Sequence, residues 1–283
     1  MANMRAIRNR IKSIESTRQI TRSMRMVAAA KLRRTQERWQ QLNEFSRISM
    51  DVLRRLCAGM KEIKNPLLRP RGGKRLCLVL FVGNRGLCGT YNSSVVKAAE
   101  ERIARGGEVS LVVCGRWGRE QIAALGCPVL RVFDSLSDTP GEDEAVEICE
   151  YLKTLYLEEQ TDRIELLYEH YRSALSQETD FLTLLPMAHE GGEATEDVIF
   201  EPDAETLLDR LSELVLRHTL YAVLLEAKTS EHTARMTAMS AACDNTDELI
   251  ASLSLKLNHA RQAAITTEIT EIVSGSKALQ KKS

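Results

Sequence analysis

Two long stretches of the chain, one at each end, contain no residue that strongly disfavours an α-helix. All six prolines and fourteen of the fifteen glycines lie between residues 59 and 202, so residues 1–58 and 203–274 hold neither type. In the interior of a helix, glycine costs about 1 kcal/mol and proline about 3 kcal/mol relative to alanine. The pattern therefore predicts one long helix at each end and a different kind of structure between them.

Apolar and small residues recur in both predicted helices at alternating spacings of three and four. In the first helix they are Met4, Ile7, Ile11 and Ile14, and after a skip Ile20, Met24 and Val27. In the second helix they are Met239, Cys243, Thr246, Ile250, Leu253, Leu257, Ala260 and Ala264. This spacing is typical of the seam of a coiled coil. Helices of this length need a partner along their length, so a coiled-coil seam is predicted for both ends.

The middle of the chain alternates short apolar runs with amphipathic segments. Strands are predicted at 76–82, 108–114, 128–133, 163–173 and 180–186, and helices at 90–104, 115–125 and 142–159. Strands that alternate with helices favour a mostly parallel sheet covered by helices, so the predicted fold class is α/β. Residues 189–198 are predicted to form an acidic loop that returns the chain to the last helix.

The composition argues against several classes of protein. The longest apolar run, residues 76–82, is much shorter than the ~20 residues that a membrane-spanning helix needs. The seven cysteines show no CxxC spacing and the five histidines are scattered, so we expect reduced thiols and no metal site or cofactor. No arrangement of a nucleophile with a histidine indicates catalysis.

The net charge of zero conceals a strong asymmetry. Residues 1–75 carry a net charge of +15, and the rest of the chain carries −15. The arginine-rich stretch 8–34 has three interpretations: a targeting peptide, a nucleic-acid-binding arm, or one helix of a coiled coil. The helical pattern continues to Leu56, beyond the basic part, and no aromatic residue precedes Trp39. Both observations favour the coiled coil.

A glycine-rich loop over residues 82–92 follows the first predicted strand and opens a helix. Its glycines, Gly83, Gly86 and Gly89, have the spacing GxxGxxG. This is neither the dinucleotide motif GxGxxG nor the phosphate-binding motif GxxxxGK[ST]. A tight turn is favoured, and a nucleotide-binding α/β enzyme with helical arms stays open as the alternative, beside a basic coiled-coil nucleic-acid binder.

Three segments of this sequence resemble the γ subunit of F-type ATP synthases. They are IRNRIKSIESTRQITRSMRMVAAAKLRR (7–34), NRGLCGTYN (84–92) and ARMTAMSAACDNTDELIASLSLKLNHARQAAITTEITEIVSGSKAL (234–279). The resemblance implies that two terminal helices, 1–60 and 203–283, form an antiparallel coiled coil. It also implies a central Rossmann-like α/β domain, 75–200, that binds no nucleotide.

The resemblance further implies a function as a non-catalytic rotor subunit. Such a subunit transmits rotation between a ring of membrane c subunits and three catalytic β subunits, and so couples ion flow to ATP synthesis or hydrolysis. The implied partners are the α, β and ε subunits and the c-ring, with membrane contact through the c-ring only and no nucleic acid. The expected location is the cytoplasmic face of a bacterial plasma membrane, because no transit segment is evident in the sequence.

The resemblance also implies where this chain contacts its partners. On the first helix, the residues expected to face acidic loops of the β subunits are Arg22, Met24, Arg25, Lys31, Arg33 and Arg34. In the central loop, the motif at the domain surface is Arg85, Gly86, Leu87, Cys88 and Gly89. On the last helix, the interface and coupling residues are Arg235, Met236, Arg261, Gln262, Thr266 and Glu268.

Overall fold

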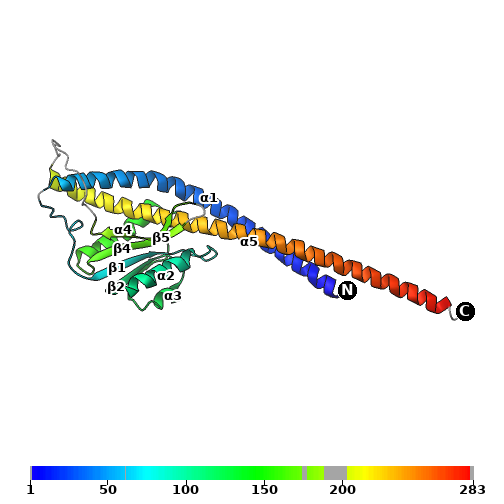
Figure 1. The fold of residues 1–283 in the computed structure, drawn as a ribbon. Coiled ribbons are helices and arrows are strands. Elements are labelled where there is room, and N and C mark those ends of the chain that lie inside the picture. The colour runs from blue at the N-terminus through cyan, green and yellow to red at the C-terminus, as the bar shows by residue number, and fades with distance from the viewer. Residues whose placement is uncertain (1, 61, 174–176, 188–202, 281–283) are drawn as a thin grey trace. The chain divides into compact units, whose positions relative to one another are not determined.

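A computed structural model describes residues 2–60, 62–173, 177–187 and 203–280 of the chain (Figure 1). Helix α1 (Ala2–Ala58) and helix α5 (Ala204–Gln280) are the two long terminal helices, and the strands and shorter helices lie between them in the sequence. The predicted helix at each end is therefore confirmed. Helix α5 continues through Gly275, beyond the point where the absence of glycine and proline predicted it to end.

The contacts within the chain divide it into two units, which are described separately here. The outer unit consists of the chain up to Val27 and from Ala238 onward, so it contains the outer parts of α1 and α5. The inner unit, Ala28–Thr237, contains the remaining parts of both helices and the whole sheet. The three-part division at 1–60, 75–200 and 203–283 stays a prediction.

The inner unit contains one five-stranded sheet in the order β3-β2-β1-β4-β5. The strands are β1 (Arg75–Phe81), β2 (Glu108–Cys114), β3 (Val129–Phe133), β4 (Arg163–Tyr171) and β5 (Gln177–Leu185). Strands β1 to β4 run parallel to one another, and β5 pairs with β4 in the antiparallel direction. The mostly parallel sheet predicted from the sequence is confirmed.

Helices cover both faces of this sheet, which explains why its central strand is a continuous apolar run. The shorter helices are α2 (Tyr91–Ala104), α3 (Arg119–Ala123) and α4 (Glu142–Leu157). Side chains of β1 alternate: Val79 packs in the cluster with α4, α5 and the end of α1, whereas Leu78 packs in the cluster with α2 and α3. Figure 1 shows α2 and α3 on the face of the sheet turned away from the long helices.

Two of the predicted elements differ from the structure by three residues or more at one end. Only Arg119–Ala123 of the predicted helix 115–125 is helical, because Gly115 and Gly118 adopt positive φ angles of 129° and 75° that a helix does not allow. Strand β5 begins at Gln177 and not at residue 180, since its pairing with β4 extends to the bridge between Tyr171 and Gln177. The predicted acidic loop 189–198 lies outside the described residues.

Candidate functional site

One row of shielded side chains follows α1 over almost its whole length. It keeps alternating spacings of four and three through Ile7, Ile11, Ile14, Arg18, Thr21, Arg25, Ala28, Leu32, Thr35, Trp39, Leu42, Ser46, Ser49, Leu53 and Leu56. All of these residues except Arg18 are buried or half-buried. This is the seam of a coiled coil.

The predicted seam of α1 was wrong at two positions. Ile20 and Val27, which were expected to lie in it, are 58% and 54% exposed. The seam makes no skip: it continues through Thr21 and Ala28, which are polar or small. A search for large apolar residues misses such positions.

The outer unit pairs the two helices in opposite directions. In α5 all eight predicted seam residues, from Met239 to Ala264, are buried or half-buried, as expected. Thr21 Oγ1 lies 3.3 Å from Cys243 Sγ, and Arg18 forms an ion pair of 2.7 Å with Asp247. Arg18 precedes Thr21 in α1, whereas its partner Asp247 follows Cys243 in α5, so the two helices run antiparallel.

The inner unit shows the same direction of pairing. Ser46 Oγ lies 3.3 Å from Thr219 Oγ1. Lys64, which follows α1, forms an ion pair of 3.3 Å with Glu205 in the first turn of α5. The end of α1 therefore meets the beginning of α5 in this unit as well.

The six residues of α1 expected to face a partner fall into two groups by exposure. Arg22, Arg33 and Arg34 are exposed, while Met24, Arg25 and Lys31 are half-buried. Arg33 forms a 3.0 Å ion pair with Glu37 one turn later. Lys31 forms an ion pair with Asp138, in the segment that precedes α4. Because Lys31 has this internal partner, the exposed positive charge among these six residues rests on the arginines.

The predicted central loop is a tight turn held by side chains of α2. The amide of Gly83 donates to Asn92 Oδ1 at 2.8 Å, and Asn92 Nδ2 donates to Cys88 Sγ at 3.1 Å. Leu87 and Gly89 adopt positive φ angles of 60° and 59°. Leu87 is 63% exposed, whereas Cys88 is 2% exposed and burial raises the pKa of its thiol. The side chain of Cys88 thus stabilises the loop from inside.

Three charged residues on one face of α5 are connected to this loop through Arg235. Arg235 donates to the carbonyls of Arg85 and Gly86 at 3.3 and 3.4 Å. It also forms a 2.8 Å ion pair with Glu231, which forms a second 2.8 Å ion pair with Lys228. The side chain of Glu231 is only 2% exposed. We call Lys228, Glu231 and Arg235 the ionic cluster of α5.

The charge of Glu231 is stabilised by its two neighbours. Burial by itself would raise the pKa of this carboxyl, but the charges of Lys228 and Arg235 outweigh burial and lower the pKa below its ordinary value. The carboxylate also lies against the turn: a Cβ atom added at Gly83 would come within 3.0 Å of Glu231 Oε1. The turn therefore packs closely against this carboxylate.

Besides its contact with the central loop, α5 makes a polar contact with the segment before α4, at Asp138. His232 Nε2 lies 2.6 Å from the carbonyl oxygen of Asp138, whose carboxylate is the partner of Lys31. Burial lowers the pKa of His232, so its neutral form, with Nε2–H as donor, fits this contact. Asp138 therefore links both long helices to the central part of the inner unit.

Up to residue 274, the C-terminal part of α5 has no row of shielded side chains. Residues 265–274 are all exposed, among them Ile269 at 57% and Ile272 at 71%. The predicted coupling residues Arg261, Gln262, Thr266 and Glu268 are exposed as well. Figure 1 shows this end of α5 continuing past the N-terminus of α1. Its side chains are therefore free to contact other proteins.

The described residues include neither a cluster that could hold a metal ion nor a helix that could cross a membrane. Among them, no group of three or more histidine, cysteine or acidic side chains is placed to hold a metal ion. Within the same ranges, no helix combines the length and apolar composition needed to cross a bilayer. All seven cysteines carry free thiols, and six of them are buried.

Comparisons with known proteins agree along the whole chain. A family profile described as ATP synthase matches residues 3–279. The ATP synthase gamma chain of Halothermothrix orenii is 40% identical, over 99% of this chain and 100% of that protein. The chain belongs to the ATP synthase gamma chain family. The gamma chain of Heliobacterium modesticaldum is 39% identical, again over 99% and 100% of the two chains.

Solved structures of ATP synthases share the fold of this gamma chain family member. One chain of the Euglena gracilis mitochondrial ATP synthase rotor matches with a TM-score of 0.69 and 19% identity, over 93% of this chain and 99% of that one. A chain of the Tetrahymena thermophila mitochondrial central stalk and c-ring matches with a TM-score of 0.60 and 22% identity, over 79% and 99%. The fold expected from the sequence is thereby confirmed.

The structure also reveals residues that the sequence did not single out. Lys228, Glu231, His232 and Asp138 were not among the candidate residues, yet they hold the central loop and the segment before α4 against the long helices. One signal was present: Glu231 has a lysine three residues before it and an arginine four residues after it, which places all three on one helix face. Charges on one face usually mean a solvated surface, and nothing in the sequence indicated that these are buried.

Proposed function

We propose that this chain is a non-catalytic rotor subunit that transmits rotation between a membrane ring and the catalytic subunits of an ATP synthase. The observation that carries the proposal is the antiparallel pairing of α1 and α5, seen in the outer unit at Thr21 and Cys243 and in the inner unit at Ser46 and Thr219. Two long helices that support each other resist bending and twisting better than one. The relatives named ATP synthase gamma chain support the same conclusion.

The internal contacts of the inner unit suit the transfer of torque. The ionic cluster of α5 binds the central loop, and Asp138 joins α1 to α5. A force applied to the α/β part of this unit therefore reaches both helices. We infer that Cys88 and Arg235 act by holding the inner unit together, whereas the exposed residues Arg85, Leu87 and Gly89 are free to contact another subunit.

The partners proposed for this chain follow from its relatives. A Euglena gracilis structure with the same fold is described as the OSCP, F1 and c-ring assembly, and the Tetrahymena thermophila structure as the central stalk and c-ring. We infer that this chain likewise assembles with α, β and ε subunits and a c-ring. It would be peripheral to the membrane, at the cytoplasmic face of a bacterial cell.

The exposed residues of each long helix are proposed to contact the catalytic ring. Arg22, Arg33 and Arg34 supply positive charge that acts over several ångströms and does not require one exact geometry. Such a contact can be broken and remade as the subunit turns. Near the end of α5, Arg261, Gln262, Thr266 and Glu268 are exposed and free to meet other subunits.

The first prediction tests the end of α5 in the assembled complex. Replacing both Arg261 and Gln262 by alanine should lower the number of ions pumped per ATP about three-fold, the effect of losing a contact worth under about 1 kcal/mol. ATP hydrolysis and ATP-driven ion uptake are measured together in membrane vesicles. The complex should still assemble, because both side chains are exposed.

The matched control is a double variant of the same helix, Ser252→Ala with Lys256→Ala, whose side chains are also exposed. It should pump at the wild-type ratio. Normal ion pumping per ATP in the Arg261 and Gln262 variant would refute the coupling role of these two residues. Normal pumping by a complex that lacks this chain entirely would refute the rotor function itself.

A further inference from the structure

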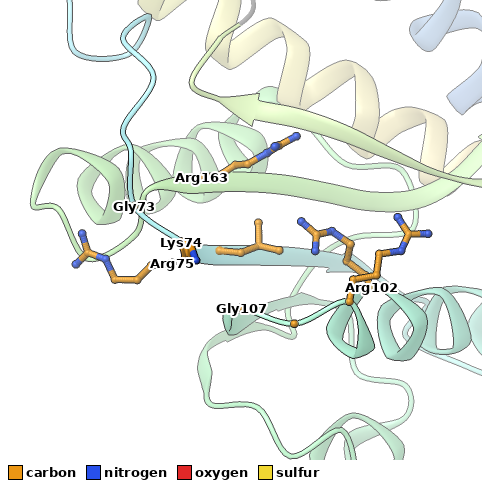
Figure 2. Close-up of a pocket in the computed structure, with 9 residues that line it drawn as sticks. Gly73, Lys74, Arg75, Arg102, Gly107 and Arg163 are labelled. Carbon is orange, nitrogen blue, oxygen red and sulfur yellow. The ribbon is translucent and has the colours of Figure 1, made fainter.

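A positively charged cavity of about 450 Å³ opens at the end of the sheet where β1 and β4 begin (Figure 2). Five of the nine residues that line it are basic and none is acidic: Lys74, Arg75, Arg102, Arg105 and Arg163. Figure 2 shows Arg75 at the start of β1, Arg102 near the end of α2 and Arg163 on β4. Three separate elements thus contribute positive charge to the lining, although the side chains of Arg75 and Arg102 point in opposite directions in this view.

Two buried carboxylates behind the cavity hold three of the arginines in place. Asp162 accepts two hydrogen bonds from the guanidinium of Arg75, at 3.0 and 2.7 Å. Glu165 accepts two from Arg102, at 2.8 and 3.2 Å, and forms a 2.9 Å ion pair with Arg163. Both carboxylate side chains are only 6% exposed. The guanidinium groups are therefore oriented before any ligand arrives.

The two carboxylates neutralise only part of the charge. Five basic side chains and these two acids leave a net charge of +3, which Glu108 and Glu159, whose charges also act on Arg75, reduce to +1. Within the described parts of the chain, the side chains of Lys74 and Arg105 have neither a hydrogen bond nor an ion pair. The C-terminal end of α2, where Arg102 and Arg105 lie, carries only about half a negative charge, so it does not restore the balance.

The glycines of the lining meet requirements of the backbone and of Asp162. Gly106 and Gly107 have φ angles of 86° and 116°, and a Cβ atom at Gly106 would meet nothing within 4 Å. At Gly73 a Cβ atom would fall 2.0 Å from Asp162 Oδ2, so only glycine lets the carboxylate that orients Arg75 lie there. The backbone at Gly73 thus leaves room for the carboxylate of Asp162.

We propose that this cavity binds a small anion that carries phosphate groups, either free in solution or as a lipid headgroup. The paired donors of Arg75 and Arg102 are already used by Asp162 and Glu165, so the anion would be bound by the two cations without partners, Lys74 and Arg105. The volume lies within the range of ~300–1,000 Å³ that is usual for small-molecule sites. This inference does not rest on the rotor function, because the cavity is formed by the α/β part of the inner unit alone.

The test uses pyrophosphate and the full chain. Isothermal titration should show saturable binding to the wild type. Lys74→Ala with Arg105→Ala should weaken it about ten-fold or more, because two unpaired cations are lost. The three arginines that pair with Asp162 and Glu165 are left intact in this variant, so it should fold normally. Pyrophosphate should also raise the melting temperature of the wild type more than that of the variant.

The matched control removes the same amount of charge elsewhere. Lys97→Ala with Lys256→Ala replaces two exposed lysines that lie outside the cavity, and it should leave the affinity for pyrophosphate unchanged. Equal weakening by both double variants would show that pyrophosphate is attracted by the overall charge and would overturn the proposal.

A second arm distinguishes the two sources of phosphate. The same proteins are sedimented with vesicles of phosphatidylglycerol or of phosphatidylcholine, which carries no net charge. Binding to phosphatidylglycerol that is lost in the Lys74 and Arg105 variant would identify a lipid headgroup, and binding to pyrophosphate alone a free ligand. Saturable binding to neither probe would overturn the proposal.

Discussion

Glu231 is the residue on which the ionic cluster of α5 depends, since it is the only partner shared by Lys228 and Arg235 within that cluster. Replacing it by glutamine keeps the size of the side chain and removes the charge. Two buried cations would then face each other without an anion. The free energy of unfolding of the inner unit should therefore fall by roughly 3–5 kcal/mol. Urea unfolding followed by tryptophan fluorescence measures this, because Trp39 and Trp117 both lie in the inner unit.

The control for this prediction is Glu37→Gln on α1. Glu37 also pairs with an arginine, but both side chains are more than half exposed. Exposed pairs of this kind contribute about 0.3–0.5 kcal/mol, so the variant should unfold almost like the wild type. A Glu231→Gln protein as stable as Glu37→Gln would show that the ionic cluster does not hold the inner unit together.

Glu169, on β4, should make the stability of the chain depend on pH. Burial raises its pKa from 4.5 to about 7, and a hydrogen bond with Ser94 opposes this only in part. Between these two values the unfolded chain has lost the proton and the folded chain keeps it. The unfolded state binds fewer protons, so the free energy of unfolding should fall as pH rises from about 4.5 to 7, by up to about 3 kcal/mol.

Comparison with Glu169→Gln isolates this effect from other titrating groups. The variant cannot ionise at this position, so the difference in unfolding free energy between wild type and variant should change over the same pH interval and level off above it. The measurement is urea unfolding at several pH values from 4 to 8. A difference that stays constant over the interval would show that Glu169 is ionised in the folded chain.

At the level of elements, the alternating spacing of four and three residues along α1 explains which of its side chains stabilise the pairing with α5. Leu53 lies in the seam and is 0% exposed, whereas its neighbour Val52 is 48% exposed. Leu53→Ala should lower the free energy of unfolding by about 2–5 kcal/mol, because it removes buried contacts and leaves a cavity. Val52→Ala, the matched control, should change it by less than about 0.5 kcal/mol. If the two variants lost equal free energy of unfolding in urea, the assignment of Leu53, and not Val52, to the seam would be wrong.

The sequence predicted the elements well because helix-breaking residues and apolar runs are local signals. The bounds of β2 matched the prediction, and both long helices were found from the absence of glycine and proline. The seam between Ile14 and Ala28 was missed in part. Its members there, such as Thr21 and Arg25, are shielded by a partner helix that is distant in the sequence, and no local pattern reveals that.

The same limit applies to the candidate site. Exposed positions such as Arg261 and Arg34 were named from the resemblance to γ subunits, and both lie on the exposed surface of a helix that the sequence predicted correctly. The internal role of Arg235 was not foreseen, because its contacts with the carbonyls of Arg85 and Gly86 join segments about 150 residues apart. Burial of a charged residue depends on the tertiary fold, and a sequence pattern of charges does not contain it.

At the scale of the whole molecule, a rotor requires that its paired helices turn together. Thr21 and Cys243 offer a direct test in the outer unit, because their side-chain atoms are 3.3 Å apart across the seam. A Thr21→Cys variant should form a disulfide with the native Cys243 on mild oxidation, which counting free thiols would detect. If α1 and α5 rotate as one body, this cross-link forbids no motion that the complex needs. ATP hydrolysis and ATP-driven ion pumping should then continue at rates close to those of the reduced complex.

The variant Thr21→Cys with Cys243→Ser is the control, since it keeps the new thiol and removes its partner. Oxidation should leave its free thiols and its activity unchanged, which separates the effect of the cross-link from damage to the other subunits. Loss of pumping on oxidation of Thr21→Cys, restored by a reductant and absent in the control, would show that the two helices slide or unwind against each other during turnover. Torque would then have to pass along one helix at a time, and the antiparallel pair would not be the element that transmits it.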